Sequence, residues 1–226
     1  MSPLRIDVQG HSTISKPAER ATLYILVTAT GIDQKTAIQD VTKASNSIQN
    51  LLKSDLAPKD ASGKPTADAA VTQWTMTGLS TWTFTTFGHV GGQNQTAKID
   101  FEVTFRDFSR LGSVVTNLSS TPHVSIKRIQ WSLTEETRRA YSGQNRREAV
   151  EDAFAKARDY ADAVGLANVT AVDITDSLAP VPFHGPTLFG STAARGPGFA
   201  AAPQELSFEP EDIEMHSQIR VIFEAS

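Results

Sequence analysis

The residues best suited to acid–base chemistry or metal binding in this chain are its five histidines, His11, His89, His123, His184 and His216. None has a second histidine or a carboxylate at the spacing of a metal motif, so a metal site would require distant segments to converge. Histidines at the surface, or hydrogen-bonded in the core, are the simpler interpretation. The chain has no cysteine, which excludes disulfides, thiolate nucleophiles and zinc sites with sulfur ligands. The sequence therefore predicts no metal site and no cofactor.

Sequence motifs for nucleophilic catalysis and nucleotide binding are also missing. The chain contains no G-x-S-x-G elbow, no G-x-x-x-x-G-K-[ST] loop and no dinucleotide fingerprint. The HVGG segment at 89–92 resembles a glycine-rich loop, but it does not lead from a strand into a helix and is interpreted as a plain turn. We therefore expect no catalytic residue and no enzymatic activity.

Four arginines before and within the first turn of a long helix could contact an anion: Arg138, Arg139, Arg146 and Arg147. The alternative, which we favour, is a solvated face on which they pair with Glu135, Glu136, Glu148 and Glu151. Because cations are mildly unfavourable at a helix N-terminus, the helix is expected to begin near Gln144. A net charge of −4 also argues against nucleic-acid binding.

Aromatic side chains give the best indication of an interaction surface. A threonine-rich stretch from Val71 to Phe87 contains Trp74, Trp82, Phe84 and Phe87. Trp82 and Phe84 share one phase of a strand, so their burial in the core is the first interpretation and a contact with a partner or subunit is the alternative. The Pro/Gly/Ala-rich segment at about 177–211 adds three contact candidates, Phe183, Phe189 and Phe199, and two polar ones, His184 and Arg195.

These residues need strands and helices to position them, and the hydrophobic periodicity predicts both. Alternation indicates strands near 4–8, 21–31, 71–87, 97–106, 124–133, 169–175 and 213–223. The run at 21–31 is apolar on both faces, which predicts a central strand covered on each side. Breaks in phase predict bulges near Gly78 and at Lys127–Arg128. Helices are expected at 33–54, at 108–118 after an Asp107 cap, and in a long helix that stops at Gly165.

The long helix has a distinctive spacing of small residues. Alanines recur every four positions, at Ala149, Ala153, Ala157 and Ala161, which permits close approach to a sheet or another helix. Gly10 in the first strand likewise indicates a bulge or a close approach. Asp152 and Lys156 are expected to form an i, i+4 ion pair on the solvent side.

The predicted class is α+β, with antiparallel β-sheet ribbons and two long amphipathic helices and one short helix packed on the sheet. A single domain is expected over residues 1–226. No signal peptide or membrane-spanning run is visible in the sequence, so we expect a cytoplasmic protein without a membrane span.

Several segments, taken in order with the helix at 33–54, resemble the SIMPL-domain family, named for a signalling molecule that associates with a pelle-like kinase. They are IDVQGHSTISKPAERATLYILVTATG, QWTMTGLS, AKIDFEVTFRDFSRLG, VSIKRIQWSLTEE, DYADAVGLANVTAVDITDS and IEMHSQIRVIFEAS. The resemblance implies an α+β fold with helices on antiparallel sheet and no established enzymatic activity. It also implies that bacterial relatives are typically exported and that at least some assemble into large rings or channel-like oligomers, whereas the animal relative is a signalling adaptor. It provides no catalytic residues for this chain.

Two functions remain open from the sequence. The first is a non-catalytic protein-interaction or self-assembly module, a homo-oligomer or the binder of a protein partner. The alternative is a small-ligand binder or an unrecognised enzyme that uses the 177–211 segment as a lid. Nucleic-acid binding, which rests only on the four arginines, is not expected.

Overall fold

A computed structural model describes residues 3–85, 93–176 and 208–226 of the chain, without the side chains of 84, 85 and 93. Contacts divide these residues into two compact units. Unit 1 contains residues 3–18, 133–176 and 212–226, and unit 2 contains residues 19–85, 93–132 and 208–211. The expectation of one folding domain stays a prediction, and each unit is described by itself below.

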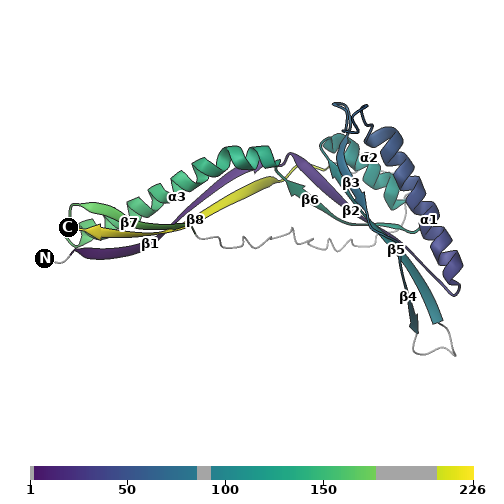
Figure 1. Cartoon of the computed structure of the whole chain (residues 1–226), viewed down its shortest axis with the longest axis horizontal. Helices are drawn as coiled ribbons and strands as arrows, with labels where there is room; N and C mark the ends of the chain where they lie inside the picture. The colour runs from purple at the N-terminus through teal and green to yellow at the C-terminus, as the bar shows by residue number, and fades with distance from the viewer. Residues whose placement is uncertain (1–2, 86–92, 177–207) are drawn as a thin grey trace, which may run out of the picture. The chain divides into compact units, whose positions relative to one another are not determined.

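Unit 1 is a three-stranded antiparallel sheet in the order β1-β8-β7 (Figure 1). Its strands are β1 (Leu4–Pro17), β8 (Asp212–Ala225) and β7 (Val169–Asp176). β1 and β8 pair without interruption from Leu4 opposite Ala225 to Pro17 opposite Asp212. The first and last strands of the sequence are thus neighbours in the sheet. Both are longer than the alternation at 4–8 and 213–223 predicted.

One face of this sheet is covered by α3 (Glu135–Ala163). The row of alanines faces the sheet and is fully buried: Ala149, Ala153, Ala157 and Ala161. Gly10 permits this contact, because a Cβ at Gly10 would lie 1.9 Å from the Ala149 carbonyl oxygen. The predicted close approach is confirmed, and β1 contains no bulge at this position.

The start of α3 differs from the expected one near Gln144. The helix begins at Glu135, and the Thr134 side chain caps it by accepting a hydrogen bond from the Thr137 N–H. Glu135 and Glu136 occupy the first turn, where carboxylates interact favourably with the helix dipole. The acidic residues that precede the arginines therefore form the N-terminal turn, which removes the electrostatic reason for a later start.

Unit 2 is built on a five-stranded antiparallel sheet in the order β3-β5-β2-β6, with β4 also paired to β5. Its strands are β2 (Arg20–Gly31), β3 (Val71–Met76), β4 (Ser80–Thr85), β5 (Gln93–Phe105) and β6 (Val124–Ser132). A register shift in β6 between Ile126 and Arg128 confirms the bulge predicted there.

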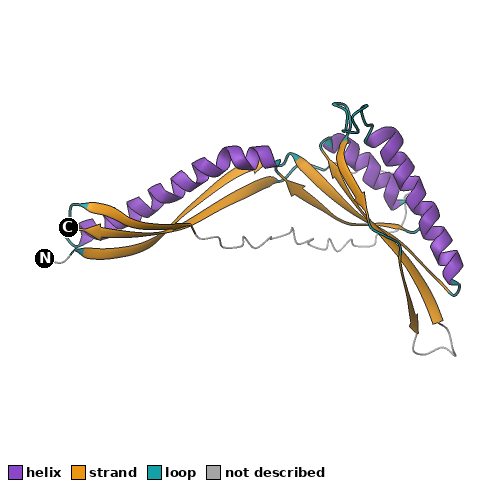
Figure 2. Ribbon diagram, in the orientation of Figure 1, coloured by secondary structure: helices purple, strands orange, loops and turns teal. Residues whose placement is uncertain are grey.

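Both helices of unit 2 lie on the same face of its sheet, as Figure 2 shows. They are α1 (Gln34–Leu51), continued by a π-helical turn η1 (Leu52–Leu56), and α2 (Phe108–Ser119). Asp33 and Asp107 cap them by accepting hydrogen bonds from backbone N–H groups of the first turn. The α+β class is confirmed. The strands form two separate sheets, and the π-helical turn η1 is present in addition to the three expected helices.

The core of unit 2 lies between these helices and one face of the sheet. Alternate residues of the two central strands, such as Leu23, Ile25 and Phe101, are at most 1% exposed. Phe208, four positions before the start of β8, is partly buried against this core. The expectation that the 21–31 strand is covered on both faces is wrong, since Tyr24 and Leu26 point to the face without helices and are only half-buried.

Candidate interaction surface

One face of the five-stranded sheet of unit 2 is left open by the described helices, and we call it the helix-free face. Threonines line it in cross-strand pairs, with Thr22 Oγ1 3.2 Å from Thr104 Oγ1 and Thr30 Oγ1 2.9 Å from Thr96 Oγ1. These hydroxyl pairs satisfy one another along the sheet. The face is therefore polar and ordered by its own contacts.

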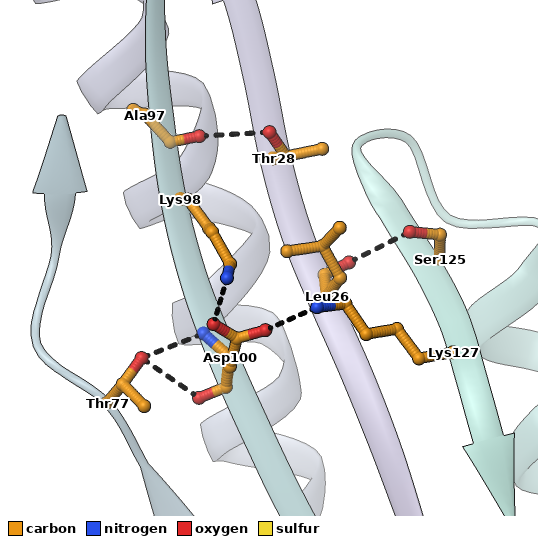
Figure 3. Close-up of polar contacts among 8 residues, drawn as sticks. All are labelled: Leu26, Thr28, Thr77, Ala97, Lys98, Asp100, Ser125 and Lys127. Atoms are coloured by element: carbon orange, nitrogen blue, oxygen red, sulfur yellow. Dashed lines mark hydrogen bonds and ion pairs between the residues drawn. The ribbon is translucent and has the colours of Figure 1, made fainter. Parts of the chain in front are cut away.

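Asp100 forms the electrostatic centre of this face (Figure 3). Its carboxylate lies 2.7 Å from Lys98 Nζ and 3.1 Å from Lys127 Nζ, so it links β5 to β6 across β2. Burial raises the pKa of Asp100, but hydrogen bonds from Lys98 and Lys127, together with their charges, outweigh it and leave the pKa below its ordinary value. Asp100 is thus an ionised structural anchor, with a pKa far from that of a general base working at neutral pH.

Tyr24 is held beside this anchor by two residues of β6. The Arg128 guanidinium lies 4.2 Å from the centre of the Tyr24 ring, and the Tyr24 hydroxyl donates to Gln130 Oε1 at 3.2 Å. The bulge in β6 brings both Lys127 and Arg128 into contact with this face. The bulge that the phase break at Lys127–Arg128 predicted therefore places both cationic side chains, Lys127 and Arg128, on the helix-free face.

Trp82 of β4 faces away from the helices, and its position follows from a second bulge. Ser80 is four positions after Met76, whereas their partners on β5, Lys98 and Phe101, are three positions apart. The extra residue confirms the bulge predicted near Gly78 and reverses the side on which later residues point. Trp82 consequently lies opposite Thr96, on the helix-free face, and is 46% exposed.

Residues 77–79, between β3 and β4, are fixed to β5 by hydrogen bonds to Asp100. The Thr77 N–H donates to the Asp100 carbonyl at 2.9 Å, and the Asp100 N–H donates to Thr77 Oγ1 at 2.9 Å. Leu79, in the same interruption, is 44% exposed. The interpretation that Trp82 is buried in the core is wrong. Trp74, which lies on β3, does pack partly against the core.

A family model described as SIMPL, protein of unknown function (DUF541), matches residues 6–223. The chain belongs to the SIMPL family. The match spans both units and confirms the resemblance seen in the ordered sequence segments. Comparison with curated proteins gave no match for this chain.

The four arginines of this SIMPL member are all exposed on α3. Arg139 Nε lies 3.0 Å from Glu135 Oε1, one turn earlier, which is one of the acidic neighbours expected on a solvated face. Glu148 instead accepts hydrogen bonds from Ser12 Oγ at 2.7 Å and from Gln144 Nε2 at 2.8 Å. An anion contact at these arginines stays a prediction.

A hydroxyl, an imidazole and a carboxylate meet on the sheet of unit 1, and the sequence analysis missed them. Thr13 Oγ1 lies 3.0 Å from His216 Nδ1, and His216 Nε2 lies 3.4 Å from Glu214 Oε2. The spacing of Glu214 and His216 on one strand was a usable signal, but Thr13 joins them only through the β1–β8 register. The order of groups is that of a catalytic triad. However, the His216 and Glu214 side chains are 46% and 60% exposed, so water screens the groups that would have to stabilise charge.

Several sequence candidates lie outside the described residues: Phe87, His89, Phe183, His184, Phe189, Arg195 and Phe199. Phe84 occupies the position opposite Asn94 in the β4–β5 register, and its side chain is likewise not described. Their roles as contact or ligand residues stay predictions.

Two shallow surface depressions in the described residues of unit 2 were considered as sites for small ligands. One, of about 480 Å³, lies along the outer side of α1 at Ile38 and Asn46, and the other, of about 420 Å³, lies between Ala57 and Trp74. Neither is lined by a carboxylate or a histidine.

Across residues 3–85, 93–176 and 208–226, no group of three His, Asp or Glu side chains could hold a metal ion. Within the same ranges, every helix is too short or too polar to cross a bilayer.

Proposed function

We propose that this SIMPL member is a non-catalytic protein-interaction module that self-associates through the helix-free face of unit 2, with Trp82 at the centre of the contact. The observation that carries the proposal is the 46% exposure of Trp82 on a sheet face that none of the described helices covers. Tryptophan is highly buried on average and is enriched at the energetic centres of interfaces.

The chemistry of the surroundings supports an interface between proteins. Leu79 adds a second exposed apolar side chain, and the adjoining threonines and the Asp100 cluster supply a polar rim that is already ordered. Interfaces typically combine an apolar, aromatic centre with such a rim. β4 also pairs only with β5 among the described strands, so its second edge is open to an added strand.

The energy available from Trp82 can be worked from its exposure. Covering roughly 100 Å² of its remaining surface at about 25 cal/mol per Å² is worth roughly 2.5 kcal/mol per subunit. The entropy lost when two chains associate and their side chains are ordered at the interface reduces this value. Loss of Trp82 is therefore expected to weaken self-association by at least about tenfold.

The test is light scattering after size exclusion over a dilution series. The intact chain, of 24.4 kDa, is expected to form a discrete multimer that persists on dilution. Trp82→Ser should shift this equilibrium toward the monomer, while the control Tyr160→Ser, which removes a 58% exposed aromatic from α3, should leave it unchanged. A Trp82→Ser protein that melts lower but assembles normally would show that Trp82 has only a structural role.

The ligand-binding alternative depends on the 177–211 segment as a lid. Residues 177–207 lie outside the described part, and neither depression in unit 2 carries convergent charged groups. The ligand-binding alternative and a cytoplasmic location both stay predictions.

A further inference from the structure

The outer edge of β1 is closed at its centre by side chains from α3. The His11 N–H donates to Asp152 Oδ2 at 2.8 Å, and Lys156 Nζ donates to the Gln9 carbonyl at 2.9 Å. Asp152 and Lys156 also pair with each other at 2.6 Å. An edge strand exposes the N–H and C=O groups of alternate residues, and this ion pair occupies one of each on β1.

The opposite edge of the same sheet is open. In the described part of unit 1, β7 pairs with β8 and no side chain bonds to its outer main-chain groups. Val172, which forms a bulge, and Ile174 are 59% and 53% exposed on this strand. The sheet of unit 1 can therefore be extended at β7 but not at the centre of β1.

The charge of β7 indicates what kind of strand fits beside it. The strand carries Asp173 and Asp176 and no cation. Among the other edge strands described, β1 carries Arg5 and Lys16 but is closed at its centre, and β3 and β4 carry no charged residue. The remaining edge strand, β6, pairs only with β2 and carries Lys127 and Arg128, which also contact Asp100 and Tyr24 within unit 2. Opposite charges on neighbouring strands stabilise their pairing.

We propose that the open edge of β7 accepts β6 from a second copy of this chain, which extends the sheet of unit 1 by one strand. This inference rests on the proposed function of self-association and names a further contact for it. Because the two strands differ, the contact is heterologous and can repeat from copy to copy. The Asp152–Lys156 pair contributes by closing the competing edge at β1.

The test uses a labelled synthetic peptide with the sequence VSIKRIQWS of β6, titrated with the full chain and followed by fluorescence anisotropy. Saturable binding is expected, and a scrambled peptide of the same composition should bind at least about tenfold more weakly. Asp173→Lys in the full chain should weaken binding of the native peptide by a similar factor. A peptide with glutamate in place of Lys127 and Arg128 should regain binding to that variant.

Asp159→Lys provides the matched control for the charge change. Asp159 is exposed on α3, two residues after the buried Ala157 and thus on the opposite side of the helix from the sheet. Circular dichroism melting of both lysine variants shows whether they are folded, and Asp176→Lys repeats the test at a second position. Failure of the native peptide to bind, or equal binding by the Asp173→Lys, Asp176→Lys and Asp159→Lys proteins, would overturn the inference.

The outcome is distinguishable from failure of the proposed function. If the peptide does not bind but the chain still forms a multimer that depends on Trp82, the pairing of β7 with β6 is wrong and self-association stands. If the peptide binds with the expected charge dependence but the chain is monomeric at every concentration, the β7 edge accepts β6 only as a free peptide, and both the pairing between copies and self-association are overturned.

Discussion

Replacing Gly10 by alanine tests the closest helix–sheet contact in unit 1. The added Cβ would lie 1.9 Å from the Ala149 carbonyl oxygen and 2.9 Å from Ala153 Cβ. The first neighbour is main chain in the middle of α3, so it cannot rotate away as a side-chain end could. The helix or the strand would have to move by more than about 1 Å to reach ordinary van der Waals distance.

The expected magnitude combines two opposing effects. Gly10 does not have a positive φ, so alanine suits the backbone and would by itself stabilise by about 0.4–1 kcal/mol through the unfolded state. Overpacking costs about 1–3 kcal/mol, and a clash with main chain belongs at the upper end. We therefore expect Gly10→Ala to lower the free energy of unfolding of unit 1 by about 2 kcal/mol.

Urea unfolding with two optical probes separates the units. All three tryptophans, Trp74, Trp82 and Trp131, belong to unit 2, so their fluorescence reports on that unit. Far-UV circular dichroism includes the 29 residues of α3 in unit 1. Gly10→Ala should lower the midpoint of the dichroism transition more than that of the fluorescence transition.

Gly143→Ala is the matched control within α3. A Cβ there meets nothing closer than the end of the Arg147 side chain at 3.8 Å, so helix propensity should dominate and stabilise the chain by about 0.5–1 kcal/mol. If Gly10→Ala proved as stable as the unmodified chain, or as stable as Gly143→Ala, the reasoning about close packing of β1 on α3 would be refuted.

Three further changes have definite expected results. Asp107→Ala removes a cap that accepts hydrogen bonds from two backbone N–H groups of α2, and thermal melting should show a loss of about 1 kcal/mol. Asp100→Asn should cost roughly 1 kcal/mol near neutral pH. Because the folded pKa of Asp100 is depressed, its contribution is complete above the unfolded value of about 3.9 and is lost as the pH falls through the folded pKa. Urea titrations of both proteins should therefore converge in acid, and a difference that persists there would contradict the assignment. Asp152→Ala combined with Lys156→Ala opens the edge of β1, and light scattering should detect larger species than for the unmodified chain.

Regular periodicity predicted most of the fold, because it depends on which side chains must be buried. The alternation in β5 and the alanine row of α3 correctly indicated the strand, the helix and the face of each that is covered. The start of α3 differs from the predicted one because Glu135 and Glu136, which precede the arginines, occupy the first turn and interact favourably with the helix dipole. Local propensity near a helix end depends on a few residues and is easily outweighed.

The candidate surface was less predictable, because it depends on register between distant strands. Both bulges were visible in the sequence, but their effect on Trp82 requires counting residues against β5, which the sequence alone does not pair with β4. The meeting of Thr13 with His216 similarly requires the pairing of the first and last strands. The apolar second face of β2 suggested cover on both sides, whereas Leu26 and Tyr24 are only half-buried and Tyr24 lies under the Arg128 guanidinium.

The bulge between β3 and β4 determines which face of the sheet carries Trp82, the residue on which the proposed function depends. Without the extra residue, Trp82 would continue the phase of Met76 and point toward the helix side of the sheet. With it, a large aromatic side chain lies on the only face of that sheet that the described helices leave open. Thr77 fixes this arrangement to the main chain of Asp100, and Asp100 is itself fixed by two lysines. The exposed tryptophan is therefore held on an ordered support, and a rigid aromatic anchor loses little conformational entropy when a partner covers it.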